Sequence, residues 1–281
     1  IKTILLTYSA ILFILLFYLQ IGGFVNEKKL LNIENDNEKL RKIWLSNINS
    51  NQYSTFENNS KKKVLIIGNS HARDLFNIFN SNLDIFMEYD FAIFDSQIEC
   101  FLKNIKKDYS GKCEYLYEKP NIEIIDNNFY QNFSQAEYII LSTQWSFLDV
   151  LRLEDEVIPF LKKNYKKIIV TSNSPRFFFN IKDPKNPFTL LDIKLRNIKE
   201  ENFSINSMEN IEKLHYKSMT KPIIKLNNWL EEISKRNDVL YLRKENFICK
   251  MKLSKCHVVT DKGFKIFWDN SHLTIEGASF F

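Results

Sequence analysis

Short apolar runs recur along the chain, and helical periodicity lies between them. The first run, Val64–Ile67, ends at Gly68, and apolar residues then return on one helical face between Arg73 and Leu83. Comparable runs lie within DIFMEYDFAIFD, QAEYIILSTQW, KKIIVTSNSPRF and DVLYLRKENFIC, and helical stretches occupy LEDEVIPFLKKNY and Met208–Lys235. Apolar strands that alternate with amphipathic helices are typical of a parallel sheet covered on both faces. The pattern therefore predicts an α/β domain.

The start of the chain has a different character. No charged residue stands between Lys2 and Glu27, and a span of roughly 20 apolar residues crosses the hydrocarbon of a bilayer. Apolar residues on every face favour a membrane span over a buried core helix, and a cleaved signal peptide would have a shorter apolar core. We predict a transmembrane helix over residues 1–25. Because residue 1 is isoleucine, we expect the chain to be a fragment or a processed product.

A linker is predicted over residues 26–62, before the main domain at 63–281. Its first half is expected to be an exposed helix with a partial apolar stripe of Leu30, Leu31, Leu40, Ile43 and Trp44. Its second half is rich in Asn and Ser, as linkers are. Within the main domain, PRFFFNIKDPKNPFTLLD is interpreted as an irregular insertion.

Composition and cysteine usage narrow the class of protein. Hydrophobic residues make up 44% and charged residues 26%, as in globular proteins, and the net charge of +5 is too small and spread out to favour nucleic-acid binding. The pairs Cys100/Cys113 and Cys249/Cys256 fit two short disulfide loops in an oxidising compartment. Zinc ligation and reduced buried thiols are the alternatives. We therefore expect the main domain to lie outside the cytoplasm.

Candidate polar groups gather where predicted strands end. Ser70 follows the first strand, Gln144–Trp145 follows the third, and Asp269 and His272 stand in a polar turn near the end. Ligands of open α/β sheets bind beyond the carboxyl ends of the strands. A serine hydroxyl needs a base such as histidine, whose tautomer a carboxylate can hold. Two simpler interpretations stay open, namely Ser70 as a helix N-cap and DNSH as a solvated Asx turn.

The other histidines are interpreted as structural. His71 is expected to pack at the turn or to cap the helix, and His215 and His257 are expected on the surface. None has a metal-ligand partner at workable spacing, so no metal site is predicted.

Two distant blocks, IIGNSHARD and WDNSHLTIEGA, resemble the first and last blocks of the SGNH (GDSL-like) hydrolase family. The chain is most similar to the branch of extracytoplasmic SGNH domains fused to integral-membrane acyltransferases. That branch commonly has a cysteine pair before the final Asp–x–x–His block, as in ICKMKLSKCHVVTDKGFKIFWDNSHLTIEGA here. The resemblance covers the chain from about Lys63 to its end. It implies a flavodoxin-like, three-layer SGNH hydrolase fold with a parallel sheet, preceded by one transmembrane helix.

The resemblance also implies residue roles. Ser70 would be the nucleophile, His272 the general base and Asp269 the acid that orients it, and the Ser70 backbone N–H would contribute to the oxyanion hole. The family's other oxyanion donors, a glycine and an asparagine in Gly–x–Asn–Asp, are not found in this sequence. Ser96 or Gln97 is expected to replace the glycine amide, and Gln144 to replace the asparagine side chain.

The function implied is O-acylation, most simply O-acetylation, of hydroxyls on a bacterial cell-surface polysaccharide, lipopolysaccharide or peptidoglycan through an acyl-serine. The domain would itself bind no cofactor. Acetyl-CoA would be the ultimate donor through a partner membrane acyltransferase domain, and a carbohydrate would be the acceptor. The expected location is the inner membrane, with the main domain in the periplasm. The alternatives are a carbohydrate acetylesterase and a non-catalytic glycan-binding domain of the same fold.

Overall fold

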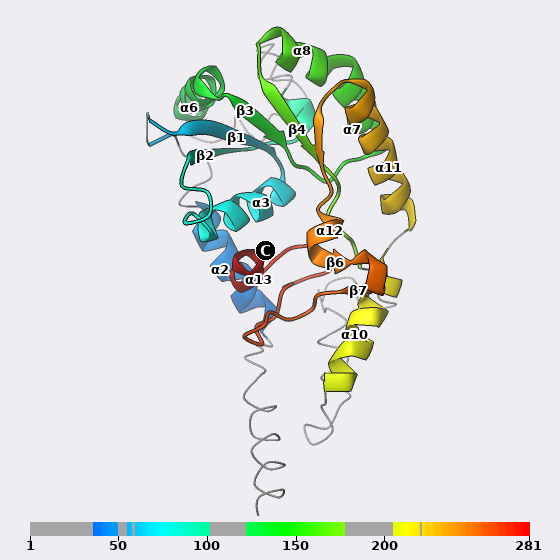
Figure 1. Cartoon of the computed structure of the whole chain (residues 1–281). Coiled ribbons are helices and arrows are strands. Elements are labelled where there is room, and N and C mark those ends of the chain that lie inside the picture. The colour runs from blue at the N-terminus through cyan, green and yellow to red at the C-terminus, as the bar shows by residue number, and fades with distance from the viewer. Residues whose placement is uncertain (1–35, 50–54, 58–59, 102–121, 178–204, 220) are drawn as a thin grey trace, which may run out of the picture.

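The structure is a computed structural model that describes residues 36–49, 55–57, 60–101, 122–177, 205–219 and 221–281 (Figure 1). Its main sheet has five parallel strands in the order β2-β1-β3-β4-β5. The strands are β1 (Lys62–Gly68), β2 (Tyr89–Asp95), β3 (Tyr138–Leu141), β4 (Lys167–Thr171) and β5 (Leu240–Leu242). The strands β2 to β5 lie within the segments that the apolar runs predicted, and β1 contains the predicted run Val64–Ile67. The α/β class with a parallel sheet is therefore confirmed, and the strand order is that of flavodoxin-like doubly wound sheets.

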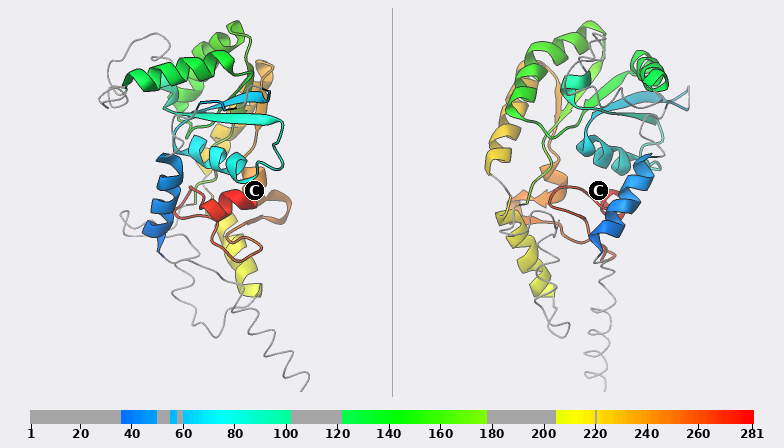
Figure 2. Two further views of the ribbon diagram at one scale, coloured as in Figure 1. Left: turned by 90° about the vertical axis from the view of Figure 1, so that its left-hand side faces the viewer. Right: turned by 180° about the vertical axis from the view of Figure 1, so that it is seen from behind.

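Helices cover both faces of this sheet (Figures 1 and 2). On one face α3 (Ser70–Ser81) packs Leu75 and Phe76 onto Val64, Ile66 and Ile93. The other face carries the larger core cluster, to which the remaining sheet-covering helices contribute. They are α6 (Ile122–Gln135), α7 (Phe147–Arg152), a π-helical turn (Leu153–Val157), α8 (Ile158–Lys163) and α11 (Lys221–Arg236). Burial of apolar side chains on both faces explains why the strands are continuous apolar runs.

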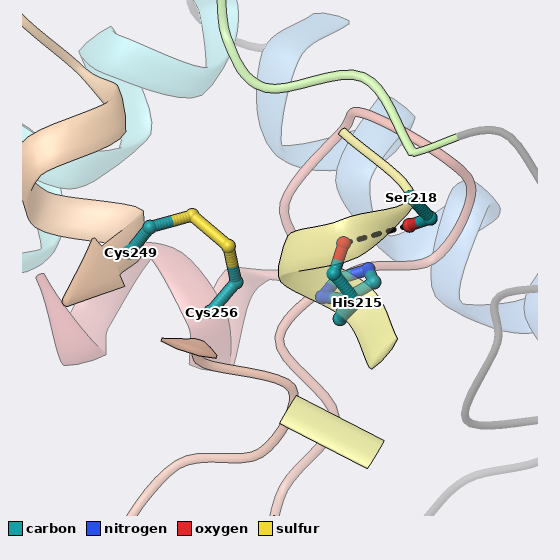
Figure 3. Close-up of a disulfide and its surroundings, with 4 residues drawn as sticks. All are labelled: His215, Ser218, Cys249 and Cys256. Carbon is teal, nitrogen blue, oxygen red and sulfur yellow. Dashed lines mark hydrogen bonds between the residues drawn. A yellow bond between two sulfur atoms is a disulfide. The ribbon is translucent and has the colours of Figure 1, made fainter. Parts of the chain in front are cut away.

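The C-terminal part of the chain forms a smaller unit beside the carboxyl ends of the strands. It contains α10 (Ile205–Lys217), α12 (Glu245–Ile248), a hairpin of β6 (Cys249–Lys250) and β7 (Lys255–Cys256), a 3-10 turn (Met251–Leu253) and α13 (Ile275–Phe280). A disulfide joins Cys249 to Cys256 across the hairpin (Figure 3). This predicted pairing is confirmed. Cys100 is also disulfide-bonded, whereas Cys113 lies outside the described residues.

Helix α2 (Asn37–Asn49) precedes the sheet in the chain and lies against α3 and α13 in all three views (Figures 1 and 2). The predicted linker thus contains a helix, but this helix is docked. Leu40 and Trp44 of the predicted stripe are buried in one cluster with Trp268, while Ile43 is exposed. Leu30 and Leu31, the transmembrane helix at 1–25 and most of the predicted insertion lie outside the described residues. Among the residues that are described, we find no helix with the length and apolar character of a membrane span.

Candidate active site

The turn between β1 and α3 places Ser70 at the edge of the sheet. Gly68 ends β1, and its lack of a side chain lets β1 approach the Ser142 carbonyl at the end of β3. Asn69 is the N-cap of α3, because its side chain accepts the His71 backbone N–H at 3.2 Å. Ser70 is therefore the first residue of the helix. The alternative interpretation of Ser70 as the cap is wrong, and the Ser70 hydroxyl is not needed for capping.

The turn near the C-terminus is held by Asp269. Its Oδ1 atom accepts the backbone N–H groups of Ser271 at 2.8 Å and His272 at 2.7 Å, which is the Asx turn that the sequence allowed. Its Oδ2 atom lies 2.6 Å from His272 Nδ1. One carboxylate therefore both shapes the turn and contacts the imidazole, so the two interpretations of this segment are compatible.

The fold brings these two turns into contact. Ser70 Oγ lies 2.9 Å from His272 Nε2, although the two residues are 202 positions apart in the chain. The Ser70, His272 and Asp269 side chains thus form one continuous hydrogen-bonded series, and each keeps some solvent access. A hydroxyl, an imidazole and a carboxylate in this order have the geometry for removing the proton from the hydroxyl oxygen.

The charges around the imidazole favour its protonation. Burial disfavours the cation, but the hydrogen bond that Asp269 accepts from the ring and the charges of Asp74 and Asp269 outweigh it, so the pKa of His272 is raised above its usual value. Burial also works against the Asp269 carboxylate, but its hydrogen bonds to His272 and Ser271 outweigh this and the pKa of Asp269 is lowered. Asp269 thus stays ionised, and His272 becomes a stronger base.

Aromatic rings enclose the imidazole. The Trp268 ring stacks on His272 with centroids 5.2 Å apart, and the His71 ring stacks on it at 5.3 Å. His71 is buried, as the packing interpretation predicted, and its Nδ1 lies 3.1 Å from Ser174 Oγ. Burial lowers the pKa of His71 well below its usual value, which keeps this second imidazole neutral. It therefore adds packing beside His272 without adding a positive charge.

The residues predicted to replace the family's other oxyanion donors differ in their hydrogen bonds and in their exposure to solvent. The Ser96 backbone N–H donates to the Gly68 carbonyl at 2.8 Å, so it is engaged in main-chain pairing. Gln97 is exposed and immediately precedes the next helical segment. Gln144 is also exposed, and its backbone N–H donates to Asn69 Oδ1 at 3.2 Å. Asn69 thereby links the Ser70 turn to the segment after β3.

A pocket of about 270 Å³ lies next to the Ser70–His272 contact. It is lined by residues that follow β3 and β4, by the start of α11 and by the neighbours of Ser70 and His272: His71, Gln144, Trp145, Asn173, Ser174, Arg176, Pro222, Ile223 and Ser271. Sequence reasoning missed Asn173. Its Oδ1 accepts the Trp145 backbone N–H at 2.7 Å, and its Nδ2 is buried with no hydrogen-bond partner among the described residues. Its position just after a parallel strand was the available signal.

His215 is not a surface residue, so that prediction is wrong. It is 2% exposed, and its ring stacks on Phe177 at 3.5 Å. Figure 3 shows it on α10 near the Cys249–Cys256 bridge, with the His215 carbonyl accepting the Ser218 hydroxyl. The reason is that α10 is covered by β7 and by the core cluster of the C-terminal unit. His257 is also partly buried, with the Phe280 ring 5.2 Å away.

Comparison with protein families decides the classification. The model for the SGNH domain (fused to AT3 domains) matches residues 38–281. The chain belongs to this SGNH family. The match includes α2 as well as the sheet and both turns of the candidate site.

The chain shares its fold with a solved structure. The periplasmic domain of the lipopolysaccharide acetyltransferase from Salmonella ser. Paratyphi A aligns with a TM-score of 0.53 and 18% identity, covering 84% of each chain. A GDSL-like lipase from Bacteroides thetaiotaomicron aligns with a TM-score of 0.37 and 14% identity, covering 83% of this chain and 90% of its own. No curated protein sequence matches the chain significantly.

Proposed function

We propose that this SGNH domain is an extracytoplasmic O-acetyltransferase that modifies hydroxyls of a bacterial cell-surface polysaccharide through an acyl-serine. The observation that carries the proposal is the contact between Ser70 Oγ and His272 Nε2, with Asp269 behind the imidazole. Membership of the SGNH family fused to AT3 domains supports acyl transfer as the reaction class and a membrane acyltransferase domain as the partner. The fold shared with a lipopolysaccharide acetyltransferase domain agrees with this assignment.

In the first half-reaction, Ser70 Oγ attacks the carbonyl carbon of the acyl donor while His272 Nε2 takes the hydroxyl proton. Asp269 Oδ2 holds the Nδ1–H tautomer and stabilises the imidazolium that forms. The proton then passes from His272 to the leaving group, and the acetyl ester of Ser70 remains. The raised pKa of His272 suits this step, because a stronger base removes the serine proton more readily.

The negative oxygen of the tetrahedral intermediate needs hydrogen-bond donors. The Ser70 backbone N–H stands at the N-terminus of the twelve-residue helix α3, where free amides and the helix dipole favour an anion. We assign the further donors to the Gln97 backbone N–H and the Gln144 side chain. Ser96 is the weaker candidate, because its N–H must first leave the Gly68 carbonyl.

In the second half-reaction, a sugar hydroxyl in the neighbouring pocket gives its proton to His272, and its oxygen attacks the acetyl carbonyl. The bond between the acetyl group and Ser70 Oγ then breaks, and His272 Nε2 returns the proton to Ser70 Oγ. The donor for the first step would be supplied by the membrane acyltransferase domain, with acetyl-CoA as the ultimate source. This arrangement places the protein in the inner membrane with its SGNH domain in the periplasm. The oxidised Cys249–Cys256 pair fits that compartment.

The Asp269→Asn variant is expected to lower acetyl ester turnover by on the order of 10⁴-fold. The amide oxygen can keep the two backbone bonds of the turn, but the Nδ2 group would face His272 Nδ1 and disfavour the productive tautomer. Loss of the charge also lowers the pKa of His272. Since the base must be neutral, the acidic limb of the kcat/KM–pH profile moves to lower pH. Asp261→Asn, at an exposed position, serves as the control, and an unchanged profile in Asp269→Asn would contradict the role of Asp269.

Transfer itself is tested with the purified 281-residue protein, p-nitrophenyl acetate as donor and oligosaccharides from lipopolysaccharide or peptidoglycan as acceptors. We expect peptide mass spectrometry to find an acetyl ester on Ser70 and to find acetylated oligosaccharide that increases with acceptor concentration. Release of acetate with no acetylated sugar would favour the esterase alternative. Absence of any acyl-serine would leave only a binding role.

A further inference from the structure

Helix α2 contributes a side chain to the surroundings of the candidate base. Trp44 is 4% exposed, and its ring centroid lies 5.6 Å from that of His272 and 5.7 Å from that of Trp268. Leu40, one turn earlier, is buried in the same cluster. At the start of the helix, the buried Asn37 side chain accepts a hydrogen bond from Lys265. Asn37, Leu40 and Trp44 therefore attach the first two turns of the helix to the segment that carries Asp269 and His272.

Trp44 also holds a second carboxylate near the base. Its Nε1–H donates to Asp74 Oδ1 at 2.8 Å. Asp74 follows Ser70 by four residues on α3, so the two side chains share one face of that helix. Asp74 is 4% exposed, and its Oδ2 has no hydrogen-bond partner among the described residues. A buried carboxyl with a single donor is sensitive to the loss of that donor.

The electrostatics link Asp74 to His272. Burial raises the pKa of Asp74 to about 7, against the opposing effects of His272 and of the Trp44 hydrogen bond. The Asp74 charge in turn helps to raise the pKa of His272. The other ionisable groups that act on this pair are Asp269, Lys244, Arg176 and His71. Asp74 is therefore close to its own midpoint at neutral pH, where a small change in its contacts alters the charge beside His272.

We propose that Trp44 and Asp74 are positioning residues for His272, so that docking of α2 is required for an active site. The proposal rests on the assignment of His272 as the general base. Trp44 would hold the imidazole in position by packing against it. The Trp44 Nε1–H would stabilise the ionised form of Asp74, whose charge makes His272 a stronger base. Loss of this docking would thereby lower the reactivity of Ser70.

Three substitutions separate packing from charge. Trp44→Ala removes both the ring and the N–H, and we expect kcat/KM for p-nitrophenyl acetate to fall by about 100-fold, as for a misplaced catalytic group. Trp44→Phe keeps a ring but removes the donor. Asp74→Asn keeps the shape and can still accept from Trp44 Nε1 while removing the charge. Ile43→Ala, on the same helix at an exposed position, is the matched control and should behave as the unmodified protein.

The pH dependence of kcat/KM distinguishes an electrostatic role from a purely structural one, because a structural role would leave the acidic limb of the profile in place. Without the Trp44 donor Asp74 stays neutral to higher pH, and without the Asp74 charge the pKa of His272 falls. Both Trp44→Phe and Asp74→Asn should therefore shift the acidic limb of kcat/KM to lower pH. The double variant should shift it no further than Asp74→Asn alone, because both changes act through one carboxyl.

The rate of labelling of Ser70 by a fluorophosphonate probe distinguishes failure of this inference from failure of the proposed function. If the unmodified protein is not labelled at Ser70, the proposed function itself fails. The positioning role is overturned if the unmodified protein is labelled, Trp44→Ala is labelled equally fast, and the acidic limbs of kcat/KM for Trp44→Phe and Asp74→Asn stay where they are in the unmodified protein. Where Trp44→Ala fails to fold, the two conservative variants decide the question alone.

Discussion

Replacing Ser70 with alanine is expected to reduce turnover of p-nitrophenyl acetate by on the order of 10⁴–10⁶-fold. The hydroxyl oxygen lies 2.9 Å from His272 Nε2, and it is the atom that would carry the acetyl group. Covalent labelling by a fluorophosphonate should disappear in the same variant. Both quantities are measured on the purified protein, the first by nitrophenolate release and the second by mass spectrometry of the modified peptide.

Stability should change little in this variant, because Asn69 and not Ser70 caps α3. The midpoint of thermal unfolding is therefore expected to stay close to that of the unmodified protein. Ser134→Ala, an exposed position on α6, controls for the loss of a serine hydroxyl elsewhere. Equal labelling of Ser70→Ala and the unmodified protein would show that another nucleophile reacts, and the acyl-serine mechanism would then be untenable.

Replacing Gly68 with alanine is expected to lower the free energy of unfolding by about 4 kcal/mol or more. An added Cβ would stand 1.8 Å from the Ser142 carbonyl oxygen and 2.6 Å from its carbon, and both are backbone atoms that cannot rotate away. The φ angle of +153° adds strain for any residue with a side chain. The carboxyl ends of β1 and β3 would have to separate, which would also displace Ser70. Urea denaturation followed by circular dichroism measures the effect.

The control for this variant is Lys62→Ala, at the exposed opposite end of β1, for which a change of about 0.5 kcal/mol or less is expected. If Gly68→Ala unfolded at the same urea concentration as the unmodified protein, the close approach of β1 to Ser142 would not exist. If Gly68→Ala kept its acetyl ester turnover, the reactivity of Ser70 would not depend on the exact position of the end of β1.

The bounds of the helix after β1 show where prediction from hydrophobic periodicity is inaccurate. Periodicity placed apolar positions from Leu75 to Leu83, and the observed helix starts earlier, at Ser70, and ends at Ser81. Hydrophobic spacing reports only the buried face, so it does not detect a first turn that is specified by the Asn69 cap. This difference matters for function, because it makes Ser70 the N-terminal residue of a helix.

The burial of Trp44 and His215 could not be predicted from their own segments. A partial stripe on a short helix and a lone histidine at a helical position are compatible with a surface location. What buries them is the C-terminal unit, since Trp268 covers Trp44 and Phe267 lies beside His215. The relevant partners stand far away in the chain, so only the assembled unit identifies them.

Apolar runs and cysteine spacing are local patterns, and they were enough to predict the parallel α/β core and the Cys249–Cys256 pair. The three residues of the candidate triad were predicted from two turn motifs that resemble the SGNH family. The contact of 2.9 Å between Ser70 and His272, and the placement of Trp44 and Asp74 beside them, are visible only in the folded chain. The contacts of His272 with Ser70 and with Trp44 join residues at least 202 positions apart in the chain. They depend on how helices and strands pack together, which local periodicity does not encode.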